Sequence, residues 1–384
     1  MKRVQSIDLV RGIVMIIMAL DHTRDMFHET ATTIDPLDLT KTTTAAFLTR
    51  LITHLCAPTF VFLSGVSAWL SMRNRKDVSS SRAFLLKRGL WLIILDVTLI
   101  SLGIFYDLRF GIIMFQVIGA IGFGFLMIAL LMGLPSRVVG FIGLAIIALH
   151  NTVTLLPSTG ITMMLSPLFI QSLLPIGPDH NLLIGYPPIP WLGVILAGYG
   201  FAKNFLRPSA ERKSLFLKLG IGSIALFVIL RIINVYGDPN PWTSQSSPLF
   251  TVLSFLNVTK YPPSLMFDLL FLGIMFLLLR IFDKVGSEGL AGAVKIYGKV
   301  PMFYYLIHWH LLHLLMFIVL AIQGYGPKDY SFGFNMGRPQ APNGLPLWGA
   351  YLVWIFVVVI MYPLCAWYNK YKIEHPEKTF LRYL

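Results

Sequence analysis

Apolar segments long enough to cross a lipid bilayer recur along the whole chain, and they constrain its fold more than any other feature. A membrane-spanning helix needs about 20 consecutive, mainly apolar residues. Of the 384 residues, 56% are hydrophobic and 13% are charged, whereas soluble domains carry about 25% charged residues. The sequence therefore predicts an all-α polytopic membrane protein. The ten expected transmembrane helices lie near residues 8–28, 45–71, 84–104, 112–133, 138–157, 187–205, 215–236, 264–282, 296–320 and 346–369.

The distribution of Lys and Arg predicts the orientation of these spans. With the N-terminus inside, the cytoplasmic segments carry 22 of the 31 Lys and Arg residues, and the outer segments carry 6. An excess of these residues on the cytoplasmic side is the pattern that orients membrane helices. Both termini are therefore expected in the cytoplasm. The same pattern accounts for the net charge of +13 without a nucleic-acid partner.

Residues 159–176 are apolar, but we do not assign them as a span. Pro167 and Pro175 interrupt the segment, and a crossing here would place the basic residues that follow on the outer side. We expect an interfacial or re-entrant segment on the outer side. Short loops join the spans, so residues 1–384 are predicted to form a single transmembrane domain.

Ionisable side chains follow one face of the first predicted span. Each helical residue advances about 100°, so Asp8, Arg11, His22 and Asp25 fall within a sector of about 100°. A charge at membrane depth costs at least about 2.5–3.5 kcal/mol, so this stripe needs partners or water and indicates a functional path. For Asp8, a helix cap or an ion pair with Arg11 is an equal alternative. Arg24 points away from the stripe, and its side chain is expected to extend to the outer interface.

Histidine is the residue type that best suits acid–base chemistry near neutral pH. His22 is the first candidate for a general base, because it shares the stripe and because Asp25, one turn later, can orient its imidazole. His54 and His308 are the reserve candidates. Pro58 loosens the helix that follows His54 and turns it toward the same region. His150, His310 and His313 are expected to hydrogen-bond neighbouring helices, whereas for His28 a place at the outer interface and a catalytic role are equal alternatives.

The sequence gives no support for a metal site or for ATP-driven pumping. His308 and His310 lie about 200° apart on a regular helix and cannot share an ion. Cys56 and Cys365 occupy different apolar segments and form no metal-binding pair. No phosphate-binding Gly-rich loop with its lysine is present, and no Gly-x-Ser-x-Gly turn. The Ser64-Gly65 pair indicates close packing of helices instead.

Four stretches of the chain resemble a known family. In SIDLVRG, at residues 6–12, Arg11 is followed after ten residues by His22. The other stretches are THLCAPTFVFLSG at 53–65, YPPIPWLGVILAGYG at 186–200 and YGKVPMFYYLIHWHLLH at 297–313. Together they resemble integral-membrane acyltransferases with an Arg-x10-His motif in the first helix, and in particular bacterial relatives of heparan-α-glucosaminide N-acetyltransferase.

The resemblance implies a transferase that works across a membrane. A cytosolic acyl-coenzyme A, usually acetyl-CoA, would donate its acyl group to an amine or hydroxyl of a sugar on the outer side. His22 takes the position of the catalytic base, and Arg11 would orient the donor or stabilise negative charge. The implied location is the inner membrane of a bacterium. The implied partners are acyl-CoA, a glycan or other amine or hydroxyl acceptor and membrane lipid, and a homo-oligomer is compatible with them; no metal is implied.

The first predicted inner loop and the start of the next span are rich in basic residues. Their charge suits the phosphates of the CoA nucleotide, and we expect some of them to contact it. An equal alternative is that they only set the orientation of the spans. These residues are Arg73, Arg75, Lys76, Arg82, Lys87 and Arg88.

Two other functional classes fit the ionisable stripe. In a proton-coupled transporter or a lipid flippase, the same side chains would relay protons. Transporters often contain repeated halves with matched broken helices, and the sequence shows no internal repeat. A non-catalytic scaffold is the third class, and it leaves the stripe without a role.

Overall fold

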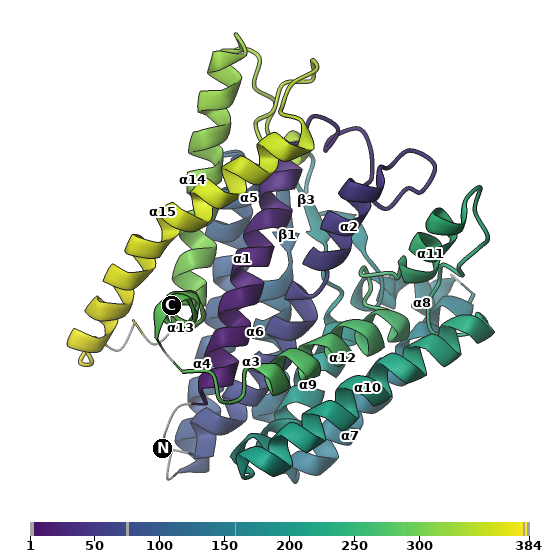
Figure 1. Ribbon diagram of the computed structural model, residues 1–384, viewed down its shortest axis with the longest axis vertical. Coiled ribbons are helices and arrows are strands. Elements are labelled where there is room, and N and C mark those ends of the chain that lie inside the picture. Colours follow the sequence, from purple (N-terminus) through teal and green to yellow (C-terminus); the bar gives the residue numbers. More distant parts are fainter. Residues whose placement is uncertain (1–3, 74–76, 158, 287, 379–380, 382–384) are drawn as a thin grey trace.

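The protein is mainly helical, with 69% of its residues in helices (Figure 1). The computed structural model describes residues 4–73, 77–157, 159–286, 288–378 and 381. The helices are α1 (Gln5–Phe27), α2 (Thr44–Thr53), α3 (Cys56–Arg73), α4 (Val78–Leu95), α5 (Ser101–Phe105), α6 (Val117–Leu131), α7 (Ser136–Leu149), α8 (Gly160–Leu165), α9 (Pro188–Phe201), α10 (Ser209–Ile233), α11 (Pro248–Leu256), α12 (Leu265–Ile281), α13 (Gly289–Lys299), α14 (Pro301–Ile322) and α15 (Leu347–Glu374). The strands are β1 (Ile112–Phe115), β2 (Ser172–Pro175) and β3 (Asn181–Ile184).

Six helical segments within the described part of the chain are long and apolar enough to cross a membrane. They coincide with six of the predicted spans, so the expectation of a helical integral membrane protein is confirmed at this level. The other four predicted spans coincide with α1, which carries several charges, and with the shorter helices α6, α9 and α12. That these four helices also cross the membrane remains a prediction. The six segments are Thr44–Arg73, Val78–Phe105, Ser136–Val153, Ser209–Ile233, Pro301–Ile322 and Leu347–Glu374.

Helix α1 runs through the middle of the molecule, with α2 and α3 on one side and α13, α14 and α15 on the other (Figure 1). Its N-terminal half packs closely on α13 because both helices have glycine at the crossing. A Cβ on Gly12 would lie 1.9 Å from the carbonyl oxygen of Val294, and one on Gly298 would lie 1.9 Å from that of Asp8. Because α14 begins directly after α13, this contact also holds α1 close to the start of α14.

Two of the membrane-spanning segments are interrupted at polar residues. Helix α2 ends at Thr53 and α3 begins at Cys56, so His54 lies in the break between them. Pro58 falls in the first turn of α3, where the N–H that proline lacks is not needed. Helix α4 continues into α5 through a π-helical turn at Asp96–Ile100, a feature often found at functional sites.

A small sheet, in the order β1-β3-β2, was not predicted from the sequence. Strand β1 pairs in parallel with β3, with Ile112 opposite Asn181, and β2 pairs with β3 in antiparallel orientation. The expectation of one helix over residues 112–133 is therefore wrong at its start, because the strand pairing removes four residues and α6 begins only at Val117. Within the described residues, 159–176 contain α8 and β2 and no spanning helix.

Gly65 lets α3 approach α9, which confirms Ser64-Gly65 as a point of close packing. A Cβ at this position would lie 2.0 Å from the carbonyl oxygen of Ile195. We expect Gly65→Ala to destabilise the protein by about 1–3 kcal/mol, because backbone must move to admit the methyl group. The thermal unfolding temperature in detergent measures this. Gly222→Ala on α10 is the control, since a Cβ there meets nothing within 4 Å; equal losses in the two variants would contradict the packing argument.

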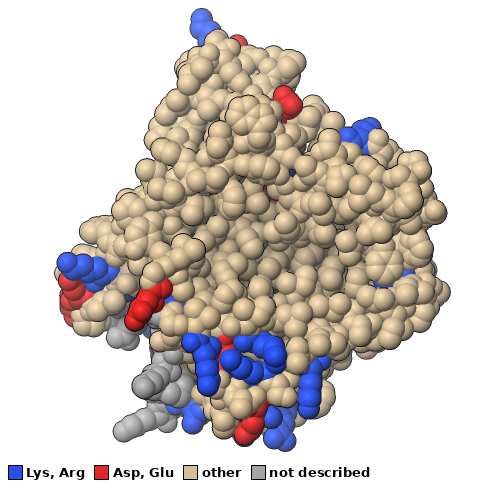
Figure 2. Space-filling model, in the orientation of Figure 1, with Lys and Arg blue, Asp and Glu red and all other residues tan. Residues whose placement is uncertain are grey.

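Basic side chains gather at one end of the molecule, at the bottom of Figure 2, while the broad middle of this face carries few charges. Helix α1 begins at the same end. We call it the basic end. The arrangement agrees with the charge asymmetry of the sequence, and the cytoplasmic location of both termini remains a prediction.

Candidate functional site

Two cavities lie along α1, one toward the basic end and one toward the opposite end. We call them the inner cavity, of about 610 Å³, and the outer cavity, of about 750 Å³. Helix α1 contributes Arg11, Met15 and Met18 to the inner cavity, and Arg24 and Asp25 to the outer cavity. Apart from Arg24, these residues share the face on which the sequence predicted an ionisable stripe.

His22 lies on the same face of α1, between the two cavities. It is about 6 Å along the helix axis from Met18 and about 4.5 Å from Asp25. Its Nδ1 is 2.7 Å from Nε2 of His308 on α14. The indole of Trp309 stacks on its ring, with the ring centroids 4.1 Å apart. The fold thus pairs two histidines that the sequence proposed separately.

Hydrogen bonding fixes the tautomers of this histidine pair. Nδ1 of His308 is 2.6 Å from the carbonyl oxygen of Tyr305 and 3.1 Å from that of Tyr304. A carbonyl oxygen only accepts, so Nδ1 of a neutral His308 carries the proton and its Nε2 accepts from Nδ1–H of His22. Nε2 of His22 is then left with a lone pair. His308 is fully buried and His22 is half-buried, so His22 is the more accessible member of the pair.

Asp21, which precedes His22, is the centre of a buried ion-pair network. Its carboxylate accepts hydrogen bonds from Arg50 at 2.5 and 2.7 Å, from Thr53 at 2.9 Å and from Arg24 at 3.2 Å. The network joins α1 to α2 directly beside the histidine pair. It also explains why Arg24 is buried, which corrects the expectation that its side chain extends to the interface.

The structure gives His22 a different partner from the one expected. The carboxylate of Asp25 pairs with Arg24, and the imidazole of His22 hydrogen-bonds to His308. The expectation that Asp25 orients His22 is therefore replaced by orientation through His308. The reason is that Arg24, bound on both sides by Asp21 and Asp25, draws the second carboxylate toward itself.

His54 is buried in the break between α2 and α3 and lines the outer cavity. Neither of its ring nitrogens has a hydrogen-bond partner among the described residues, and its ring packs edge-on against Phe267 and Phe271. The structure therefore places His54 beside Arg50 in the outer cavity and apart from the histidine pair.

The inner cavity has a basic mouth and a mainly apolar wall. Nη2 of Arg11 donates to the carbonyl oxygen of Leu63, 2.9 Å away, and to the hydroxyl of Ser67. Lys299 and Lys372 also line this cavity. Its remaining wall is formed by α3, α4, α6 and the start of α14, and it reaches Tyr305, whose ring centroid lies 6.2 Å from that of His22.

Of the six basic residues expected to contact phosphates, Arg88 lines the inner cavity. Arg73, Arg82 and Lys87 are exposed and do not line it, because they lie at the end of α3 or on the outward face of α4. Arg75 and Lys76 lie outside the described residues. The sequence missed Lys299 and Lys372, which come from segments distant in the chain and which only the folded arrangement brings beside Arg11.

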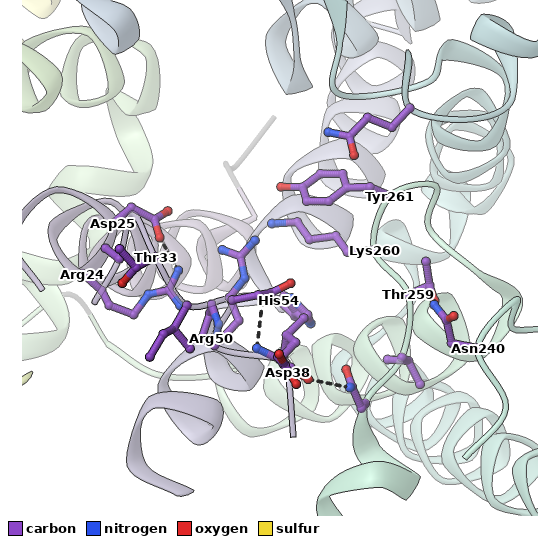
Figure 3. A pocket seen from close by; sticks show the side chains of 18 of the residues that line it. Arg24, Asp25, Thr33, Asp38, Arg50, His54, Asn240, Thr259, Lys260 and Tyr261 are labelled. Carbon is purple, nitrogen blue, oxygen red and sulfur yellow. Dashed lines mark hydrogen bonds and ion pairs between the residues drawn. The ribbon is translucent and has the colours of Figure 1, made fainter. Parts of the chain in front are cut away.

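The outer cavity is lined mainly by polar groups. Figure 3 shows Arg24 and Asp25 on one side of it and Lys260 and Tyr261 on the other, with Arg50 and His54 between them. Amide and hydroxyl side chains complete its wall, among them Thr32, Thr33, Gln171, Asn240, Asn257 and Thr259. The sequence signal for Lys260 was weak, since it appeared only as one basic residue of an outer loop.

Fold and site together define an integral membrane protein in which a buried histidine pair separates two cavities. Residues 3–231 match the family described as heparan-alpha-glucosaminide N-acetyltransferase, catalytic. The chain belongs to this family, which implies an acetyltransferase activity, and the resemblance noted in the sequence is confirmed. No curated protein matches the chain. The matched residues include Arg11, Asp21 and His22 and end before Lys260 and His308.

Proposed function

We propose that this protein transfers an acyl group, usually acetyl, from cytosolic acyl-CoA to an amine or hydroxyl of a sugar on the outer side of the membrane. The observation that carries the proposal is the position of the His22–His308 pair between a basic-mouthed inner cavity and a polar outer cavity. The membrane is expected to be the inner membrane of a bacterium.

His22 is the proposed general base. Its Nε2 accepts the proton of the acceptor's hydroxyl or neutral amine while the acceptor oxygen or nitrogen attacks the thioester carbonyl carbon. The tetrahedral intermediate collapses, the C–S bond breaks, and the CoA thiolate takes the proton from His22. His308 and Trp309 hold the imidazole during both transfers. Placing the two substrates on either side of one base lowers the entropic part of the barrier.

The inner cavity is the proposed donor site. Arg11, Arg88, Lys299 and Lys372 line it and suit the phosphates of CoA. Its apolar wall, which includes Met15 and Met18, suits the acyl end of the donor. This arrangement directs the thioester along α1 toward His22.

The outer cavity is the proposed acceptor site. Its amide and hydroxyl side chains can both donate and accept hydrogen bonds, which suits a polyhydroxylated molecule such as a sugar. Asp25 is half-buried at its wall. His54 remains the reserve candidate for the base on this side.

The donor assignment is tested by acyl transfer from acetyl-CoA to D-glucosamine with the purified protein in detergent. Replacing Lys299 and Lys372 together by methionine should raise KM for acetyl-CoA by about tenfold or more, because each removes a charged hydrogen-bond donor to phosphate. The matched control replaces Arg82 and Lys87 in the same way. This double replacement removes the same charge and leaves the lining of the cavity unchanged. A larger increase in KM from the control pair would indicate that the phosphates bind at the first inner loop instead.

A further inference from the structure

The outer cavity is lined by three cations and three carboxylates. Arg24, Arg50 and Lys260 are its cations, and Asp21 and Asp25 are the carboxylates that face them. The other carboxylates near this cavity, Asp35 and Asp38, belong to its wall and hydrogen-bond to their own loop. Both arginines are paired with Asp21, and Arg24 also with Asp25, whereas Lys260 forms no ion pair among the described residues.

Lys260 is buried without a carboxylate partner among the described residues. Its side chain is 7% exposed, and its Nζ lies over the ring of Tyr261, 5.0 Å from the centroid. An ammonium group taken out of water costs free energy unless an opposite charge compensates it. The cation–π contact with Tyr261 and the more distant charges of Asp21 and Asp25 compensate part of that cost. A negative partner from outside the protein would supply the rest.

Arg50 and Tyr261 line the outer cavity together with Lys260. Arg50 donates to both carboxylate oxygens of Asp21 through Nη1, and its side chain lines the cavity (Figure 3). Burial by itself would raise the pKa of Tyr261, yet the charges of Lys260 and Arg50 hold that pKa below its ordinary value. A pKa that is lowered in spite of burial indicates a positive local potential at the Tyr261 hydroxyl.

We propose that Lys260 and Arg50 form an anion-binding subsite of the outer cavity, which takes one carboxylate, sulfate or phosphate group of the acceptor. The inference rests on the proposed function for the identity of the ligand as the acceptor. Arg50 supplies a planar fork of donors and Lys260 a compact charge, a combination suited to an oxyanion group. The Asn and Thr side chains of the same cavity bind the uncharged part of the molecule.

Direct binding tests the subsite without any catalysis. Inorganic sulfate, compared with chloride at equal ionic strength, should raise the thermal unfolding temperature of the wild-type protein, and Lys260→Met should lose most of this increase. Lys41→Met is the matched control, because Lys41 is an exposed lysine of the neighbouring loop that pairs with Asp38. It should retain the increase. The same sulfate effect in wild type and in Lys260→Met would overturn the subsite.

Acyl transfer to two acceptors tests what the subsite holds. The wild-type protein should prefer D-glucosamine 6-phosphate to D-glucosamine, and Lys260→Met should lower this preference in kcat/KM by about 10- to 100-fold. An equal fall in kcat for both acceptors would mean that the charge acts on the transition state, and it would overturn the acceptor assignment. If sulfate binds as expected and no acyl transfer is found with any acceptor, the proposed function fails while the anion site stands.

Discussion

Replacing His22 by alanine is expected to lower kcat for acyl transfer by about 10²–10⁴-fold, the usual contribution of a general base. The proton of the acceptor would then have to pass to water, which the packed surroundings of His308 and Trp309 restrict. KM for acetyl-CoA should change little, because the proposed contacts of the donor's phosphates are with Arg11, Arg88, Lys299 and Lys372 and not with His22. The measurement is steady-state transfer from acetyl-CoA by purified protein.

Two further variants show whether the effect belongs to His22 alone. His308→Ala should also lower kcat, since His22 loses the hydrogen bond that fixes its tautomer. His310→Ala is the control, because His310 is an exposed residue on another face of α14 and its loss should leave turnover unchanged. Near-normal activity of the His22 variant together with loss in His54→Ala would move the base to the outer cavity.

Replacing Asp21 by alanine is expected to destabilise the protein by about 3–5 kcal/mol, the range for removing one partner of a buried ion pair. Arg50 would be left with an uncompensated charge, Arg24 would keep only Asp25, and Arg50 and Thr53 of α2 would lose their acceptor on α1. Thermal or denaturant unfolding in detergent measures the loss.

Asp38→Ala is the matched control for the Asp21 variant. Asp38 is also an aspartate near the outer cavity, but its bonds are to Thr40 and Lys41 in an exposed loop. Exposed pairs of this kind contribute about 0–1 kcal/mol. If the two variants unfolded at the same temperature, the network around Asp21 would have no special role in stability.

The sequence by itself predicted the features that depend on local periodicity and composition. Apolar runs identified the helical membrane class, and the 100° rotation per residue placed Arg11, His22 and Asp25 on one face of α1. In the structure, Arg11 lines the inner cavity and Asp25 lines the outer cavity. The opposite directions of His308 and His310 followed from the same geometry, and the structure has one buried and the other exposed.

Pairing between distant segments was beyond sequence reasoning. His22 and His308 are 286 residues apart, and the local sequence of neither helix predicts that they pair. Strand β1 was taken for the start of a helix because an isolated apolar run fits both conformations. The segment becomes a strand because it hydrogen-bonds to β3.

The physical reason for this division is the range of the interactions involved. Helix formation and burial in lipid depend on residues within a few turns of one another, so the sequence alone determined the helical membrane class and the charged face of α1. The ion pairs of Asp21, the tautomer of His22 and the basic mouth formed with Lys299 and Lys372 depend on side chains from several segments. Only the tertiary structure, by packing α1 against α2, α13 and α14, decided which of these charges meet.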